Sequence, residues 1–357
     1  MTNRSKNTAS SVIVVVPWYG GSHRAWADGW RSVSRHRIEL VATAPRTWRH
    51  RMLSGTAELA DELEAAASRH GTPDVVVVSS LTDTAALLGL ARRAVGDAAI
   101  VQYQHESQLL HPSLQPGDRH LVDIEWRSMA AADAVWFNSD FHRNLYLSTC
   151  PHDTSSLAAR SSTMPVGVDL SQIAVDRRPA SDPSRSVRLL FNQRWDADKR
   201  PQRVVAALAS AAAAGARFEV VLAGEQPPDD DRGLLSACER LGQRVVHAGT
   251  ATRSRYLELL HTCDAVVGDP LHEFFGVAAV EAMAAGCHPL LPQALSYPEL
   301  VDHPQRLLHR SHDLVAQIIT FCADPPAPDA TLAAHVRRFD WSRIGPLYDE
   351  AIAGLAR

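Results

Sequence analysis

The sequence is poor in cysteine and has no hydrophobic run long enough to span a membrane. Its five cysteines lie at positions 150, 238, 263, 287 and 322 and form no CxxC pair. This spacing argues against a disulfide framework or a zinc site, and for a reducing compartment. The longest apolar runs, such as residues 12–16, are too short for a transmembrane helix, and the first eleven residues are too polar for a signal peptide. We therefore expect a cytoplasmic protein with no membrane partner.

The sequence is also poor in lysine and has no excess of positive charge. The 36 basic residues include only two lysines, Lys6 and Lys199, and with 40 acidic residues the formal net charge is −4. Residues 1–180 carry equal numbers of acidic and basic side chains. The chain therefore lacks the bulk charge of a general nucleic-acid binder. Any polyanion must meet a local patch, or be small, such as a nucleotide.

Short β-branched runs alternate with Ala- and Leu-rich stretches along the chain. Such runs are typical of strands buried on both faces of a parallel sheet, and their alternation with helices indicates a doubly wound α/β fold. Helices are expected near residues 57–67 and 204–214. The expected strands are 12–16, 38–42, 74–78, 99–103 and 134–137 in a first series, and 187–191, 218–223, 244–247, 264–268 and 288–291 in a second.

A polar segment without periodicity, residues 171–186, separates the two series and contains two prolines, which is typical of a linker. Ligands of doubly wound sheets bind at the carboxyl ends of the strands, so motifs that follow strands supply the candidate site. The predicted organisation is a Rossmann-like domain over residues 1–172, a linker over 173–186, a second Rossmann-like domain over 187–336, and a final helix over 337–357 that packs back toward the first domain.

The first expected strand leads into two adjacent glycines, Gly20 and Gly21, before a helix expected to start near Ser22. Paired glycines allow close backbone approach, and a helix N-terminus offers N–H groups to an anion. The dinucleotide fingerprint GxGxxG is absent, and taken alone the pair is better explained as a tight turn. His23 either faces a ligand or caps this turn.

The second series opens with two cations, Arg194 and Lys199, directly after a strand. A planar guanidinium and a point-charge ammonium at a strand end suit a diphosphate, where negative charge builds as the phosphate leaves. A solvated basic loop is the alternative. The rarity of lysine in this chain favours a role for Lys199.

Two glutamates, Glu273 and Glu281, flank a glycine at which a helix over about 276–285 is expected to begin. The amides of Gly276 and Val277 then form an anion site. Glu281 is placed to accept hydrogen bonds from ribose hydroxyls and Glu273 to reach a sugar. The alternative is two surface glutamates, but the two phenylalanines after Glu273 favour burial of this loop.

His105 follows the expected strand 99–103, within the segment YQHESQLLHP. A histidine at this edge can donate to a sugar hydroxyl or take part in proton transfer. A histidine satisfied within the core is an equal alternative. After the next strand, Asn138 and Ser139 are expected to cap a helix.

The segment PRTWRHRM, residues 45–52, is the one candidate polyanion patch. Its arginines Arg46, Arg49 and Arg51 surround Trp48, and arginine beside an aromatic ring suits base stacking with phosphate contact. A solvated arginine face beside a buried tryptophan is the alternative.

Taken together, these motifs resemble retaining glycosyltransferases of the GT-B fold, in the GT4-like clan. The glycine pair, the Arg194–Lys199 pair and the Glu273/Glu281 pair carry that likeness. A closer resemblance, over about residues 12–301, is to the tRNA-queuosine α-mannosyltransferase family, the glycosyltransferase-like domain-containing 1 group. It is carried by PWYGGSHRAWADG, PRTWRHRM, YQHESQL, FNSDFHRNLYL, PVGVD, NQRWDADK and HEFFGVAAVEAMAAGCHPLLPQALSYPEL.

The resemblance implies two Rossmann-like domains that face a central cleft, and a retaining, metal-independent hexosyltransferase without a resident cofactor. Its donor would be a nucleotide sugar, GDP-mannose, and its acceptor queuosine in tRNA. The implied catalytic residues are His105, Glu273, Arg194 and Lys199. The implied donor-binding residues are Gly20, Gly21, Arg194, Lys199, Gly276, Val277 and Glu281. The implied acceptor-binding residues are His23, Arg46, Trp48, Arg49 and Arg51.

Other functions stay open from the sequence. One is a related glycosyltransferase with another sugar donor, or with a small-molecule or lipid acceptor. Another is a non-catalytic module that binds a nucleotide sugar or tRNA, and a further one is a nucleotide-sugar epimerase on the same architecture. The sugar, the base and the oligomeric state are not fixed by these motifs.

Overall fold

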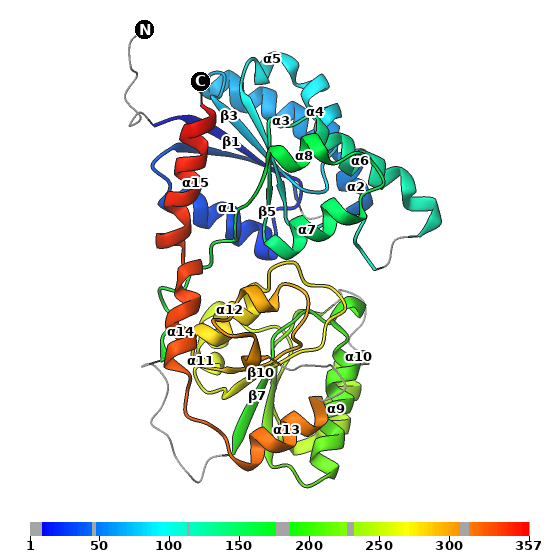
Figure 1. Ribbon diagram of the computed structural model, residues 1–357, viewed down its shortest axis with the longest axis vertical. Helices are drawn as coiled ribbons and strands as arrows, with labels where there is room; N and C mark the ends of the chain where they lie inside the picture. The colour runs from blue at the N-terminus through cyan, green and yellow to red at the C-terminus, as the bar shows by residue number, and fades with distance from the viewer. Residues whose placement is uncertain are drawn as a thin grey trace. The chain divides into compact units, whose positions relative to one another are not determined.

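The computed structural model describes residues 9–44, 48–112, 115–175, 186–226, 232–307 and 314–356. The chain divides into two compact units (Figure 1). Unit 1 comprises Met1–Val168 and Trp341–Arg357, and unit 2 comprises Asp169–Asp340. Of the expected linker, residues 176–185 lie outside the described residues.

Unit 1 is built on a parallel six-stranded sheet in the order β2-β1-β3-β4-β5-β6. The strands are β1 (Ser11–Val16), β2 (Arg37–Ala42), β3 (Val75–Ser79), β4 (Ala99–Gln104), β5 (Ala134–Phe137) and β6 (Ser161–Thr163). β3 and β4 are buried along their whole length, as expected of strands covered on both faces.

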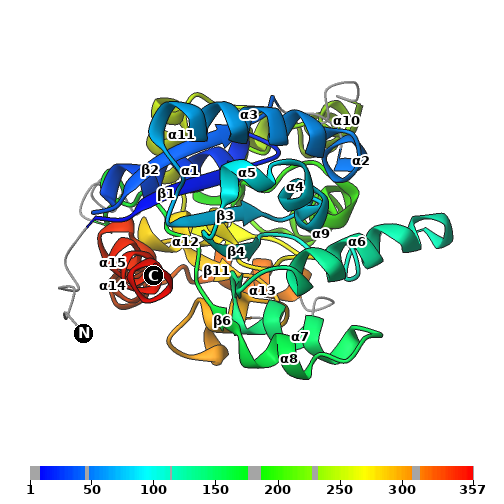
Figure 2. The same cartoon turned by 90° about the horizontal axis from the view of Figure 1, so that it is seen from above.

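Helices cover this sheet, and the last helix of the chain is one of them. They are α1 (Gly21–Val33), α2 (Trp48–Met52), α3 (Gly55–His70), α4 (Thr84–Leu90), α5 (Arg92–Val95), α6 (Arg119–Ala130), α7 (Asp140–Thr149), α8 (Ser155–Ala159) and α15 (Trp341–Leu355). Figure 2 shows α3, α4 and α5 along one side of the strands. α15 buries Trp341, Ile344, Tyr348 and Ile352, a spacing that places them on one helix face, and it packs on α1.

Unit 2 is a parallel five-stranded sheet in the order β11-β10-β7-β8-β9. The strands are β7 (Val187–Phe191), β8 (Phe218–Leu222), β9 (Val245–Ala248), β10 (Ala265–Val267) and β11 (His288–Leu290). The helices are α9 (Pro201–Ala213), α10 (Arg232–Leu241), α11 (Arg253–Leu260), α12 (Val277–Ala284), α13 (Leu314–Ala323) and α14 (Ala330–Val336).

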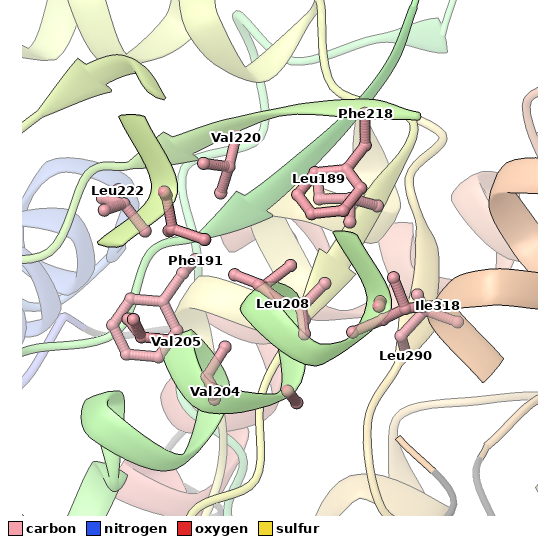
Figure 3. Close-up of a cluster of buried hydrophobic side chains, with 14 of the residues drawn as sticks. Leu189, Phe191, Val204, Val205, Leu208, Phe218, Val220, Leu222, Leu290 and Ile318 are labelled. Atoms are coloured by element: carbon pink, nitrogen blue, oxygen red, sulfur yellow. The ribbon is translucent and has the colours of Figure 1, made fainter. Parts of the chain in front are cut away.

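The core of unit 2 lies between the sheet and helices α9 and α13. In Figure 3, Phe191 of β7 lies beside Val204 and Val205 of α9, and Leu208 of α9 and Ile318 of α13 belong to the same cluster. Burying a side chain of this size contributes roughly 1.5–3 kcal/mol. The strands of unit 2 whose ends carry the candidate residues are therefore held in place by a packed core.

All ten expected strands are confirmed to within one or two residues. The sequence reasoning missed β6, a polar three-residue strand at the sheet edge. In the part of the chain that the structure describes, no helix is both long enough and apolar enough to cross a membrane.

Candidate active site

His105 directly follows β4, and its backbone is held from the two neighbouring strands. The N–H groups of His105 and Glu106 both donate to Ser80 Oγ at 3.2 Å, just after β3. The His105 carbonyl accepts from Asn138 Nδ2 at 3.0 Å, just after β5. The carboxyl ends of three parallel strands thus fix where His105 sits.

The His105 ring packs among aromatic rings. Its centroid lies 4.4 Å from His23, 4.5 Å from Tyr103 and 4.6 Å from Trp26. Its buried Nε2 has no hydrogen-bond partner among the described residues, unlike a histidine whose ring nitrogens are both satisfied within the core. Burial, assisted by His23 and His142, lowers the pKa of His105 well below its usual value. At neutral pH the ring is therefore uncharged.

The glycine pair starts α1 and sets His23 against His105. Gly20 is the N-cap, and Gly21 adopts a left-handed backbone with φ +47°. A Cβ at Gly21 would lie 3.1 Å from the Trp18 ring, so this position favours glycine for its backbone and for its space. His23, only 3% exposed, has Nε2 3.9 Å from Glu106 Oε1.

The candidate polyanion patch is described only in part. Arg46 lies outside the described residues, as do the side chains of Trp48 and Arg49, which open α2. The Arg51 guanidinium lies over the Trp18 ring, 5.6 Å from its centroid. The expected contact with Trp48 lies outside the described side chains, and the aromatic partner of Arg51 that the structure describes is Trp18, on the loop that also carries Gly20 and Gly21.

In unit 2, Lys199 lies within a cluster of opposite charge. Its ammonium donates to the His272 carbonyl at 2.6 Å and lies 3.2 Å from Glu273 Oε2 and 3.4 Å from Asp198 Oδ2. Burial lowers the pKa of Lys199, but the two carboxylates outweigh burial and raise it overall. Lys199 is thus a buried cation, and a solvated loop is the wrong description of it. Arg194 is half exposed and pairs with Asp196 at 3.0 Å.

The loop that carries Glu273 is buried, as its two phenylalanines predict. Phe274 is 3% and Phe275 5% exposed. Gly276 caps α12 with φ +101°, and a Cβ there would meet Leu300 and Tyr297 at 3.2 and 3.3 Å. A side chain at Gly276 would therefore be strained in two ways, which explains the glycine that opens this helix.

Glu281 is also not an ordinary surface glutamate. Its Oε1 lies 2.5 Å from Arg253 Nη1, and the Tyr256 hydroxyl hydrogen-bonds to it. Burial raises the pKa of Glu281 although Arg253 opposes that shift. Asn192, directly after β7, donates to the Tyr256 hydroxyl and to the Ala278 carbonyl, both at 2.9 Å.

The structure therefore assembles two separate clusters. The unit 1 cluster comprises Trp18, Gly20, Gly21, His23, Arg51, His105 and Glu106, and the unit 2 cluster comprises Lys199, Glu273, Gly276, Asn192, Arg253, Tyr256 and Glu281. Sequence reasoning missed Asn192, Arg253 and Tyr256. Asn192 could have been found by its place at a strand end, and Arg253 and Tyr256 by their place shortly after one.

Two family models match the chain. Residues 11–163 match the one described as tRNA-queuosine alpha-mannosyltransferase N-terminal, and residues 173–334 match glycosyl transferases group 1. The tRNA-queuosine alpha-mannosyltransferase of Drosophila melanogaster is 27% identical over 335 residues, which cover 88% of this chain and 87% of that protein. The GDP-mannose:cellobiosyl-diphosphopolyprenol alpha-mannosyltransferase of Xanthomonas campestris is 26% identical over 200 residues, or 53% of this chain and 52% of that protein.

Solved structures share the fold. The sucrose-phosphate synthase of Thermosynechococcus elongatus has a TM-score of 0.75 at 16% identity, with 96% of this chain and 100% of that chain covered. An Anabaena protein in complex with UDP and glucose has a TM-score of 0.68 at 17% identity, with the same coverage. With the group 1 match, these likenesses confirm the predicted GT-B fold class.

Proposed function

Because the chain belongs to the tRNA-queuosine alpha-mannosyltransferase family of group 1 glycosyl transferases, we propose that it transfers mannose from GDP-mannose to the cyclopentenediol of queuosine in tRNA. The protein is a hexosyltransferase, and transfer retains the anomeric configuration. The match of residues 11–163 carries the proposal, because it concerns the unit assigned to the acceptor.

Unit 2 holds the donor in this proposal. The ammonium of Lys199 and the guanidinium of Arg194 neutralise the diphosphate, while the Gly276 and Val277 amides at the start of α12 supply hydrogen-bond donors. Glu281 holds the ribose and Glu273 the sugar. Buried charged groups suit these tasks, because hydrogen bonds to ionised partners are the stronger ones.

The reaction forms a bond between an acceptor hydroxyl oxygen and C1 of the sugar, and breaks the bond from C1 to the β-phosphate oxygen. The acceptor proton passes to the leaving phosphate on the same face, so no carboxylate nucleophile is needed. Negative charge grows on that phosphate as the bond breaks. Lys199, fixed by Glu273 and the His272 carbonyl, stabilises it without a metal ion or a resident cofactor.

Unit 1 supplies the groups assigned to a hydroxyl of the sugar and to the tRNA. The uncharged ring of His105 keeps Nε2 free of any partner in the described part of unit 1, so it can pair with a hydroxyl of the transferred sugar. Gly20 and Gly21 contribute to the diphosphate site, and His23, Arg46, Trp48, Arg49 and Arg51 to tRNA binding. We place the reaction in the cytoplasm, in keeping with five free cysteines.

A transfer assay tests this proposal. The purified protein is incubated with GDP-mannose and queuosine-containing tRNA, with queuosine-free tRNA as the control, and the digested nucleosides are weighed by mass spectrometry. We expect one hexose on queuosine and none in the control. If queuosine gains no hexose but the donor is hydrolysed, and Glu273→Ala abolishes that hydrolysis, the protein is a glycosyltransferase with a different acceptor.

The half-chain likeness to an enzyme whose name specifies a diphosphopolyprenol acceptor makes a lipid-linked acceptor the second candidate. The same assay with a polyprenyl diphosphate sugar in place of tRNA separates the two. Hexose transfer to that lipid alone would replace the tRNA acceptor and keep the assigned donor.

A further inference from the structure

Arg200, next to Lys199, has a backbone conformation that arginine rarely adopts. Its φ and ψ are both 48°, in the left-handed region. Among the described residues, only Leu81 and Leu295 share a positive φ without being glycine. Glycine reaches this region at little cost, whereas other residues are held there only by their surroundings. The arginine at this position therefore calls for an explanation in its side chain.

The side chain of Arg200 is clamped onto Asp269, which follows β10. Arg200 Nε donates to the Asp269 backbone carbonyl at 2.6 Å, and Nη2 lies 2.8 Å from Asp269 Oδ1. Asp269 is almost wholly buried, and its second oxygen lies 2.5 Å from Arg203 Nε. A guanidinium that meets both the backbone and the carboxylate of one residue fixes orientation as well as distance.

This clamp lies at one end of a longer contact between two loops. The loop after β7 and the loop after β10 are also joined by the Leu271 N–H, which donates to the Asp198 carbonyl at 2.7 Å. At the far end, Lys199 reaches the His272 carbonyl and Glu273. Arg200 thus fixes the backbone directly after Lys199, and with it the position from which the Lys199 side chain extends.

We propose that Arg200 is a positioning residue, which acts through Asp269 to aim the Lys199 ammonium at the diphosphate of the donor. The inference rests on the proposed function, in which Lys199 stabilises the leaving phosphate. A glycine would satisfy the backbone at least as well as arginine. The side chain is therefore present for its contacts with Asp269.

The substitution Arg200→Gly separates the two roles, because it suits the left-handed backbone and removes only the clamp. We expect kcat for mannosyl transfer to fall about 10- to 100-fold, since small displacements of a catalytic group have effects of that size. The KM for GDP-mannose should change less, because charge stabilisation acts mainly in the transition state. Arg200→Lys keeps a cation near Asp269 and should recover part of the loss.

A matched control is Arg306→Gly. Arg306 is likewise an arginine paired with aspartate, here with both Asp302 and Asp329, and its side chain is 26% exposed against 23% for Arg200. We expect this variant to melt at a lower temperature with unchanged kcat. An Arg200→Gly variant with wild-type kcat, or a loss shared equally by the control, would overturn the inference.

Inorganic pyrophosphate separates failure of this inference from failure of the proposed function. Calorimetric titration should show binding to the wild type, loss of most binding in Lys199→Ala, and about tenfold weaker binding in Arg200→Gly. If no hexose reaches queuosine but this order of affinities holds, the acceptor is wrong and the positioning role stands. Equal affinity of wild type and Arg200→Gly, or no binding to the wild type, overturns it.

Discussion

In both units the candidate residues lie near the carboxyl ends of parallel strands, but the two clusters differ in charge. In unit 1, the uncharged ring of His105 packs among aromatic rings, and its contact with His23 is a ring contact of 4.4 Å. In unit 2, Lys199 lies against two carboxylates. A neutral, apolar surrounding suits sugar hydroxyls, whereas a buried cation suits a phosphate. The difference matches the roles proposed for His105, at a hydroxyl of the transferred sugar, and for Lys199, at the phosphate.

The clusters also differ in what a ligand would have to replace. In the described part of unit 1, buried His23 Nδ1 and His105 Nε2 have no hydrogen-bond partner, at a cost of roughly 1–3 kcal/mol for each such group. A hydroxyl that pairs with either ring recovers that cost. In unit 2, Lys199 and Glu281 already have partners. A donor must therefore exchange existing ion pairs for its own.

Removing the buried cation of unit 2 should have the largest effect. For Lys199→Ala we expect kcat to fall about 1,000-fold, because a preorganised charge stabilises the leaving phosphate and two carboxylates would then face it alone. Arg194→Ala should cost only about tenfold, since that guanidinium is half exposed and screened by water. Single-turnover release of GDP measures both rates. Equal losses in the two variants would contradict the distinction between buried and exposed cations.

Unit 1 contains a buried carboxylate, Glu125, whose hydrogen bonds come from neutral groups. It can be compared with the ion-paired carboxylates of unit 2. Glu125 on α6 accepts hydrogen bonds from Ser107 Oγ and from the Gln108 and Leu109 N–H groups at 3.0–3.2 Å. Burial outweighs these bonds and raises the pKa of Glu125 from 4.5 to about 7. The folded state therefore holds this proton more tightly than the unfolded chain.

Its contribution to stability is complete below about pH 4.5 and is lost as the pH rises through about 7. Relative to Glu125→Gln, the wild type should lose on the order of 3 kcal/mol of unfolding free energy across that window. Urea unfolding at pH 4.5, 6 and 8 measures the change. The exposed Glu62→Gln serves as the control and should follow the wild type. A constant difference between wild type and Glu125→Gln at all three pH values would show that Glu125 does not titrate there.

Replacing His105 should have a smaller effect on turnover than removing Lys199. We expect His105→Gln to lower kcat about 10- to 100-fold, because one hydrogen bond to the sugar is lost or misplaced. The depressed pKa of His105 means that its contribution to stability is present above about 6.5 and declines as the pH falls below that value. Between pH 7 and pH 5, His105→Gln should therefore lose less stability than the wild type. Thermal melting at pH 5 and 7 checks this, with the exposed His120→Gln as the control.

All ten expected strands were found. The clearest are β1 and β3, continuous β-branched runs that are almost wholly buried, as expected in a sheet covered on both faces. The exception, β6 (Ser161–Thr163), is three polar residues long at a sheet edge, and nothing in its composition separates it from a turn. Ser139 does cap α7, accepting from the His142 N–H, as its residue type predicts.

The sequence predicted which strand each candidate residue follows, but not which side chains touch. Parallel strands bring their carboxyl ends to one edge, so His105, Lys199 and Glu273 could each be placed beside a sheet. Which side chains touch depends on packing between segments distant in the sequence. Arg51 lies over Trp18, with more than thirty intervening residues, and Arg200 meets Asp269 across 69 positions. No local pattern encodes those pairs.

The smallest predicted effect concerns the basic segment of unit 1 that contains Arg49 and Arg51. Reversing charge in Arg49→Glu/Arg51→Glu should weaken tRNA binding about tenfold at moderate salt, and lower the slope of log affinity against log salt by about 2, because each arginine that contacts a phosphate releases about one counterion. Pyrophosphate binding should stay unchanged, since Lys199 and Arg194 of unit 2 are the cations assigned to the diphosphate. The control is Arg92→Glu/Arg93→Glu on α5, an adjacent pair of arginines whose side chains are exposed. If both double variants weaken tRNA binding equally, the effect is one of net charge. If pyrophosphate binding falls together with tRNA binding, the Arg51–Trp18 contact supports the glycine loop, and the contrast between a neutral acceptor side and a charged donor side does not hold.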